Sequence, residues 1–372
     1  MRGFNVLLAG LVLTGAAGAR AAEDYVVLQV APAVSQAGSV GWQTQIGAKI
    51  YFDEVNNRGG VSGHAIKFVA VDQGPDISAQ VRDLAKTKQP VALFGAVGPA
   101  AVNKLIGDRV LDTLQLPLVG ARTGSMALVS EKSSNWLFLT RPGYATEAEK
   151  VLKQYSTIGV RKVVVLYSED ASGREILEQV KAAAVKGGQM VEAAIPQPRD
   201  AARMTMVVNN LVNGDHQALL LATDTASAGA FLKRYREQGG SAQVVAMSSV
   251  EAVQMAQLAG TQLARGTAVV LVAPSPRNDA VAVVREFKTC YRKYGPYTEE
   301  PTQAMMEGYL AAKVLVEGLK RGNGGHAALQ RGLAGVSGFD AGGVSFSFGK
   351  GSRSGASYLE MSVLDREGRI VR

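Results

Sequence analysis

The sequence predicts an α/β protein built from two doubly wound lobes. Short apolar runs alternate with segments of helical period along the chain after residue 24. The runs are almost continuously apolar, as in "KVVVLYS" and "QALLLAT", which is typical of parallel strands covered by helices on both faces. About ten such units are more than one doubly wound sheet usually holds, and a length of 372 residues also favours two domains.

The apolar runs define the predicted strands, and the periodic segments between them define the helices. The strands in chain order are 25–31, 65–72, 91–97, 116–121, 135–141, 162–168, 190–196, 217–223, 243–249 and 267–273. The helices include 41–60, 77–87, 145–159, 174–188, 226–240 and 280–295. Glycine pairs end several of these helices, which is a usual helix stop. Thr146 and Glu149 have the spacing of a capping box and predict a helix start there.

The first residues differ from the rest and predict a cleaved signal peptide over residues 1–21. Arg2 precedes a short apolar run, and Ala19-Arg20-Ala21 fits the small-residue rule for cleavage. An uncleaved anchor is disfavoured because the run is shorter than the roughly 20 residues of a spanning helix. The mature chain is therefore expected to be exported, and it contains a single cysteine, Cys290, which can form no internal disulfide.

The sequence gives little support for catalysis, a cofactor or a nucleic-acid partner. Gly95 and Gly98 lack the third glycine of a dinucleotide motif, and neither a P-loop nor a nucleophile elbow is present. The histidines are far apart, at positions 64, 216 and 326, and lack ligands at metal spacing. The formal charge is +8, but Lys and Arg are dispersed among acids, which favours a solvated surface over a nucleic-acid site.

Small-residue loops follow several predicted strands and are the candidate functional segments. In the first half these are "APAVSQAGSVGW", "GAVGPAA", "GARTGS" and "TRPGYATE", and in the second half "YSEDASG", "LATDTAS" and "AMSSVEA". The carboxyl ends of strands are where α/β sheets bind ligands, and such loops let backbone N–H groups approach an anion. The alternative is that they are simply turns, rich in Gly and Ser for conformational reasons.

The chain resembles the periplasmic substrate-binding proteins of ABC transporters, in the leucine/isoleucine/valine-binding family. The resemblance rests on "GAKIYFDEVNNRGGVSGHAIKFVAVDQGPD", "VALFGAVGPAAV", "LPLVGARTGSMAL" and "YREQGGSAQVVAMSS", which follow the family's order and spacing. It implies a type I bilobed fold with two Rossmann-like lobes joined by three crossovers. Lobe I is expected over 22–141 plus about 270–345, and lobe II over 142–269 plus about 346–372.

The resemblance also implies a ligand site between the lobes. In lobe I it points to Ala100, Ala121 and Thr123, although Pro99 and Ala100 replace the hydroxyl that this loop usually offers. In lobe II it points to Ser172, Asp224 and Ser248, of which only Asp224 carries the charge to neutralise an ammonium group. Two aromatic residues are further candidates for the cleft wall: Tyr144, which matches a tyrosine in less characterised branches of the family, and Trp42.

Arg122 lies in the middle of the "GARTGS" loop, and two interpretations of it stay open. A guanidinium binds a carboxylate in bidentate fashion, so Arg122 is a candidate clamp for a ligand carboxylate that replaces the missing hydroxyl. The alternative is an ion pair between the lobes or at the surface, with Glu307 or Asp224 as partner.

The function expected from these features is that of an exported, periplasmic and monomeric solute receptor. It binds a small amino-acid-like or carboxylate ligand by hinge closure and delivers it to a membrane permease, without a cofactor, a metal or a catalytic step. One alternative is a periplasmic sensing module for a membrane signalling receptor, which sequence does not separate from a transport protein. A further alternative, an exported α/β enzyme, is disfavoured by the missing motifs.

Overall fold

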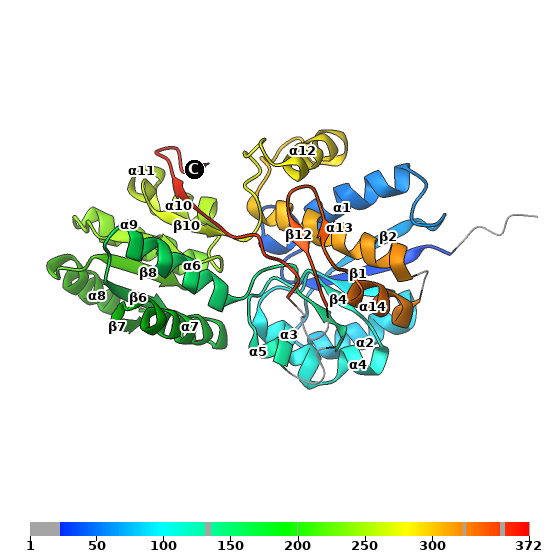
Figure 1. The fold of residues 1–372 in the computed structure, drawn as a ribbon, viewed down its shortest axis with the longest axis horizontal. Coiled ribbons are helices and arrows are strands. Elements are labelled where there is room, and N and C mark those ends of the chain that lie inside the picture. Colours follow the sequence, from blue (N-terminus) through cyan, green and yellow to red (C-terminus); the bar gives the residue numbers. More distant parts are fainter. Residues whose placement is uncertain (1–22, 131–134, 199, 323–324, 350–353, 372) are drawn as a thin grey trace, which may run out of the picture.

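The computed structural model describes residues 23–130, 135–198, 200–322, 325–349 and 354–371, and the predicted signal peptide lies outside these ranges. Two α/β lobes lie side by side along the long axis of the molecule (Figure 1). The first sheet is wholly parallel and has the order β2-β1-β3-β4-β5. Its strands are β1 Tyr25–Ala31, β2 Ile66–Asp72, β3 Ala92–Phe94, β4 Leu118–Val119 and β5 Leu137–Phe138.

The second sheet has the order β14-β13-β10-β9-β8-β6-β7, and within it β13 runs antiparallel to both of its neighbours, β10 and β14. The strands are β6 Lys162–Tyr167, β7 Met190–Pro196, β8 Ala218–Ala222, β9 Gln243–Ala246, β10 Ala268–Leu271, β13 Glu360–Leu364 and β14 Ile370–Val371. A small hairpin of β11 Phe339–Asp340 and β12 Ser345–Phe346 completes the strands. The ten predicted strands correspond to β1–β10, because continuous apolar runs favour strands buried on both faces.

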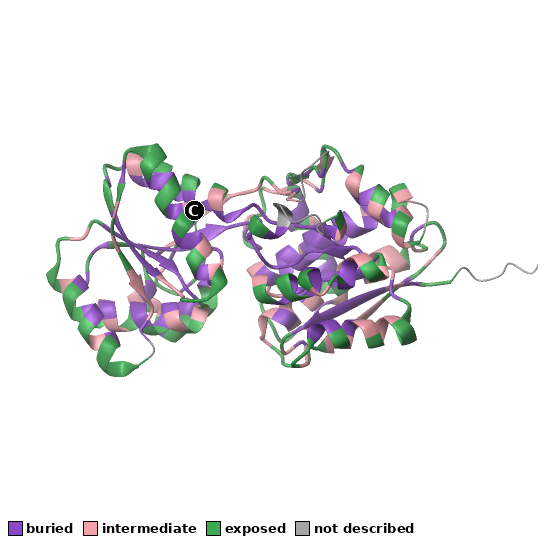
Figure 2. Cartoon of the chain, turned by 90° about the horizontal axis from the view of Figure 1, so that it is seen from below, coloured by how far each residue is buried: buried purple, intermediate pink, exposed green. Residues whose placement is uncertain are grey.

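Helices cover both faces of each sheet. Around the first sheet lie α1 Val40–Asn57, α2 Ile77–Lys88, α3 Pro99–Gly107, α4 Val110–Leu114, α5 Ala127–Ser130, α12 Ala282–Tyr294, α13 Gln303–Gly322 and α14 His326–Ala334. Around the second lie α6 Tyr144–Thr157, α7 Ala171–Gly187, α8 Ala201–Asn213, α9 Thr225–Glu237, α10 Ala252–Ala259 and α11 Thr261–Ala264. In Figure 2 the central strands are buried, whereas the helices expose their outward faces. None of the helices in the described ranges combines the length and the apolar character needed to cross a membrane.

The chain passes between the two sheets three times: between β5 and α6, between β10 and α12, and between β12 and β13. This confirms the predicted type of fold, with two doubly wound lobes joined by three crossovers. We infer that the lobe boundaries lie within these passages. Phe346 and Phe348 then belong to lobe I, because both pack in the core around α13.

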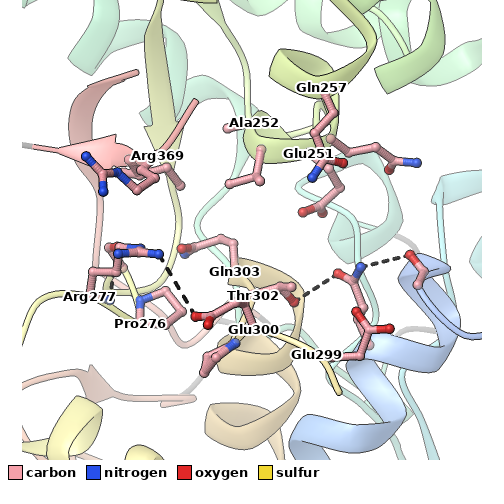
Figure 3. A pocket seen from close by; sticks show the side chains of 17 residues that line it. Glu251, Ala252, Gln257, Pro276, Arg277, Glu299, Glu300, Thr302, Gln303 and Arg369 are labelled. Carbon is pink, nitrogen blue, oxygen red and sulfur yellow. Dashed lines mark hydrogen bonds and ion pairs between the residues drawn. The ribbon is translucent and has the colours of Figure 1, made fainter. Parts of the chain in front are cut away.

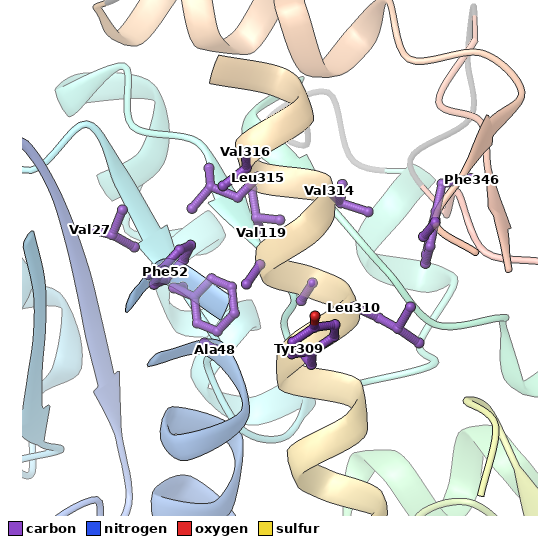
Figure 4. Close-up of a cluster of buried hydrophobic side chains, with 14 of the residues drawn as sticks. Val27, Ala48, Phe52, Val119, Tyr309, Leu310, Val314, Leu315, Val316 and Phe346 are labelled. Carbon is purple, nitrogen blue, oxygen red and sulfur yellow. The ribbon is translucent and has the colours of Figure 1, made fainter. Parts of the chain in front are cut away.

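The core of lobe I is organised around α13, which no periodic pattern in the sequence predicts. Fifteen of its twenty residues are buried, so the helix is apolar on nearly all sides. Figure 4 shows Tyr309, Leu310 and Val314–Val316 of α13 surrounded by side chains from β1, α1, β4 and β12. Residues far apart in the sequence therefore form one hydrophobic cluster in lobe I.

The start of α6 corrects one sequence prediction. The capping box expected at Thr146 and Glu149 is not formed, because the helix already begins at Tyr144 with Gly143 as its N-cap. The earlier start buries Tyr144 and Glu147 on the face that points to the protein interior. Packing of this face decides the helix start, whereas the local Thr-Glu pattern does not.

Candidate functional site

A cavity of about 240 Å³ lies between the lobes, at the carboxyl ends of strands from both sheets. Lobe I contributes the loops after β3 and β4, with Val97–Pro99 and Arg122, and the first passage contributes Arg141 and Tyr144. Lobe II contributes the loops after β6, β8 and β9. The volume is below the roughly 300–1,000 Å³ of pockets for drug-sized ligands, so the cavity suits a small solute.

Arg122 is held in the cavity wall by its backbone. Its N–H donates to Ala96 O at 2.7 Å, and its C=O accepts from Gly98 N at 3.2 Å. These bonds continue the parallel pairing of β3 and β4 into their loops, where Val97 and Arg122 form a bridge. The guanidinium is therefore carried by a well-defined backbone at the end of the sheet.

The Arg122 side chain pairs with two carboxylates from different lobes. Nη2 donates to Glu251 Oε1 and lies 3.3 Å from Glu307 Oε1, while Nη1 is buried and has no hydrogen-bond partner among the residues that the structure describes. Glu307 comes from α13 of lobe I, and Glu251 precedes α10 of lobe II. Burial alone would lower the pKa of the Arg122 guanidinium, but Glu307 and Glu251 outweigh it and the pKa is raised. The guanidinium therefore stays charged.

Arg141 and Ser248 form a second buried network in the wall of the cavity. Arg141 Nη2 donates to Ser248 O at 3.0 Å and to Ser248 Oγ at 2.7 Å. Ser248 in turn donates its hydroxyl to Glu147 Oε1 at 2.7 Å and its N–H to Oε2 at 3.2 Å. Arg141 Nε also lies 3.4 Å from Glu307 Oε2. From the first passage, Arg141 thus contacts both lobes: Ser248 in lobe II and Glu307 in lobe I.

Two long helices of lobe II direct their N-termini at the cavity. Asp170 caps α7 by accepting from Gly173 N at 2.8 Å, and Asp224 caps α9 by accepting from Ser227 N at 2.9 Å. Gly173 is required here, because a Cβ at this position would lie 2.2 Å from Ser168 O. Ser172 Oγ lies 3.3 Å from the Tyr144 hydroxyl, which closes the wall between lobe II and the first passage. Helix N-termini favour a negatively charged group nearby.

Of the site residues predicted from the sequence, the structure brings five into the wall of this cavity: Arg122, Tyr144, Ser172, Asp224 and Ser248. The other four do not line it. Ala121 packs in the lobe I core, Thr123 Oγ1 accepts from Ser125 N at 3.1 Å, and Trp42 packs against the cluster around α13. Ala100 is exposed on α3. The side chains of Asp224 and Ser248 already form hydrogen bonds with other groups of the protein.

Sequence reasoning did not identify Arg141, Glu251 or Glu147 as site residues, and it named Glu307 only as one possible ion-pair partner of Arg122. Arg141 and Glu251 lie in the loops "TRPGYATE" and "AMSSVEA", so their position after a strand was a usable signal. Glu147 and Glu307 lie within helices, and nothing local distinguishes them from solvent-facing acids. Burial in the folded protein is what distinguishes them, since Glu147 is 0% exposed and Glu307 is 8% exposed.

A second cavity, of about 280 Å³, lies on the other side of Glu251 (Figure 3). It is lined by the flank of α10, by the segment Glu299–Gln303 and by Arg277 and Arg369. Its charged side chains are largely exposed or already paired, as with Arg277, which is 4.0 Å from Glu300. The first cavity is therefore the stronger candidate, because strand ends and helix N-termini of both lobes converge there. Within the described ranges, no cluster of His, Cys, Asp or Glu is arranged for a metal ion.

Replacing Glu147 with glutamine is expected to raise the free energy of unfolding more at pH 7 than at pH 4. Burial raises the pKa of the Glu147 carboxyl, and the opposing effect of Arg141 is smaller. The folded protein therefore binds this proton more tightly than the unfolded chain. The resulting stabilisation is present below the ordinary carboxyl pKa and is lost as the pH rises through the folded-state pKa.

Urea unfolding at several pH values between 4 and 8 measures this effect. Glu149→Gln on the same helix is the control, because the Glu149 side chain is 52% exposed. The difference in unfolding free energy between Glu147→Gln and the unmodified protein should grow with pH, whereas Glu149→Gln should show little trend. A difference for Glu147→Gln that is constant across this range would contradict the assignment.

Comparison with known proteins identifies similar chains over nearly the whole length. A family model described as periplasmic binding protein matches residues 28–359. The crystal structure of a substrate-binding periplasmic protein from Ralstonia solanacearum matches with 32% identity and a TM-score of 0.84, over 94% of this chain and 99% of that chain. An extracellular ligand-binding receptor from Verminephrobacter eiseniae matches with 26% identity and a TM-score of 0.85, over 94% and 100%.

A more distant structure supports the fold alone. A branched-chain amino acid transporter substrate-binding protein from Streptococcus pneumoniae, in complex with isoleucine, has 18% identity and a TM-score of 0.79. The match covers 93% of this chain and 97% of that chain. Among curated proteins, no match to the chain is found.

Proposed function

Since this chain belongs to the periplasmic binding protein family, we propose that it is the exported solute-binding protein of an ABC-type importer. It captures a small amino-acid-like or carboxylate ligand in the cavity between its lobes and delivers it to a membrane permease. It acts in the periplasm as a monomer and makes or breaks no covalent bond. The isoleucine bound to the Streptococcus pneumoniae relative supports this class of ligand.

The observation that carries the proposal is the composition of the cavity wall. Loops at strand ends of both lobes meet there, so a ligand in the cavity touches both. A ligand that contacts both lobes has a higher affinity for the closed arrangement and shifts the population toward it. Arg122, with its buried and unpartnered Nη1, is the group best suited to hold a carboxylate.

A thermal-shift panel tests the proposal on protein unfolded and refolded to remove carried-over ligand. The panel holds amino acids, simple carboxylates and the neutral amides of the same skeletons. A ligand at about 1,000 times its Kd should stabilise the protein by roughly 4 kcal/mol. Acids should raise the melting temperature, and their amides should not.

Arg122→Gln should weaken binding of the active acids by at least about thirtyfold, since truncating one partner of a buried charge pair costs about 2–5 kcal/mol. Arg277→Gln is the matched control, because Arg277 is 56% exposed and lines only the second and neighbouring cavities. Amides that bind as well as acids, or an Arg122→Gln protein with unchanged affinity, would refute the carboxylate anchor. Absence of any shift in refolded protein would count against a receptor for these solutes.

A further inference from the structure

The Arg122–Glu251 ion pair crosses the cavity from one lobe to the other. The two residues are 129 positions apart, and their side chains are 6% and 13% exposed. Glu251 is anchored in lobe II, because its backbone N–H donates to Thr225 Oγ1 at 3.0 Å. The carboxylate on Arg122 therefore comes from the opposite wall of the proposed ligand cavity.

Glu251 differs from the other acidic helix caps at this cavity. Asp170 and Asp224 fold back and accept a backbone N–H of their own helices. Glu251 is the N-cap of α10, yet its side chain makes no capping bond. Its carboxylate extends to the guanidinium instead, so the geometry of this helix start favours contact with Arg122 over local capping.

The guanidinium is only partly used by the protein. Both Glu251 and Glu307 contact Nη2, whereas the buried Nη1 has no hydrogen-bond partner within the described part of the chain. A carboxylate that enters the cavity could take the two Nη groups in the bidentate geometry that guanidinium favours. Such a carboxylate first has to displace Glu251 Oε1, which accepts the hydrogen bond from Nη2.

We propose that Glu251 is a built-in competitor that occupies Arg122 in the empty protein and is displaced by the carboxylate of the ligand. The proposal rests on the proposed function, since it concerns the same cavity. Because the displaced Glu251 remains in the wall as an unpaired carboxylate, each carboxylate ligand binds more weakly than Arg122 alone would allow. Neutral ligands do not compete with Glu251 and are unaffected.

The opposite role for the same ion pair is a latch that holds the lobes together. A latch would favour the closed arrangement, so its removal would weaken ligand binding. Removal of a competitor strengthens the binding of carboxylates. The sign of the change in affinity therefore separates the two roles.

The experiment measures dissociation constants for propionate and propionamide by isothermal titration calorimetry, on refolded protein at constant ionic strength. Glu251→Gln should bind propionate at least about tenfold more tightly than the unmodified protein, since close charge pairs at interfaces are coupled by that much or more. Its affinity for propionamide should not change. Glu300→Gln is the matched control, because this glutamate is 89% exposed and lies on the second cavity, and it should leave both constants unchanged.

Two further variants keep the result interpretable. Glu251→Asp shortens the side chain but keeps its charge and should also tighten propionate binding, which covers the case in which Glu251→Gln folds poorly. Adding Arg122→Gln to Glu251→Gln should abolish the gain. Propionate affinity that is unchanged, weaker or undetectable in both Glu251 variants overturns the competitor role. The proposed function is judged separately, by whether the unmodified protein binds any member of the solute panel.

Discussion

Replacing Gly47 with alanine is expected to lower the free energy of unfolding by about 3 kcal/mol, near the upper end of the cost of inserting a methyl group into a packed core. Gly47 lies in α1 where this helix crosses α13, and a Cβ there would lie 1.8 Å from Met305 O. The contact is with backbone, so no side-chain rotation relieves it. Gly308 makes the reciprocal approach, because its Cβ would lie 2.2 Å from Thr44 O. Separation of α1 and α13 is the only way to admit the methyl group.

The sign of this effect is informative, because alanine is otherwise the better helix former by about 1 kcal/mol. Gly107→Ala in α3 is the matched control, since a Cβ at Gly107 meets nothing within 4 Å. This control should be neutral or slightly stabilising. Urea unfolding followed by tryptophan fluorescence is the measurement, because both tryptophans, Trp42 and Trp136, lie in lobe I. Equal midpoints for the two variants would contradict the close packing of α1 on α13.

Replacing Arg141 with methionine is expected to lower the free energy of unfolding by about 3–5 kcal/mol, the usual cost of removing one partner from a buried ionic network. Arg141 is 4% exposed and lies between Glu307 and Ser248. Without it, Arg122 is the ion-pair partner that Glu307 keeps among the described residues. Glu147 loses the positive charge that opposes its desolvation. Methionine retains the apolar stem, so the loss reports mainly on the charge.

Rescue by neutral partners tests this explanation. Adding Glu147→Gln and Glu307→Gln to Arg141→Met should restore a large part of the lost stability, because burial of a neutral group costs much less free energy than burial of an unpaired charge. Arg277→Met is the matched control: this exposed arginine is 4.0 Å from Glu300 and should change stability by less than about 0.5 kcal/mol. The network has no such role if Arg141→Met costs no more than Arg277→Met.

The strands were predictable because each is a short apolar run between helical segments, and these patterns are local. α13 was not, because a helix buried on nearly all sides shows no single apolar face. The start of α6 was predicted at the wrong residue because the packing of Tyr144 and Glu147 extends the helix beyond the local Thr-Glu signal. Tertiary contacts decide both of these features, and a single sequence does not display them.

The sequence predicted which loops form the candidate site, but it did not predict which side chains pair with one another there. Strand ends identified the loops that carry Arg122, Tyr144, Ser172, Asp224 and Ser248, since parallel strands bring these loops to one edge. The open question about Arg122 was answered in part, because Glu307 is one of its partners and Asp224 is not. Glu251 was not foreseen, because its pairing depends on how the two lobes face each other.

The position of α13 also constrains the order in which the chain can fold. The parallel strands of lobe II come from one continuous stretch, 162–271, so most of that sheet can assemble from neighbouring segments. Lobe I begins at the other end of the chain, but its largest core cluster lacks its central helix until residues 303–322 have been made. The lobe that is begun first therefore acquires its central helix only after most strands of the other lobe have been made. Until then the parts of α1, β1 and β4 that pack on α13 are uncovered, and their burial requires closure of loops that span from about half to about three-quarters of the chain.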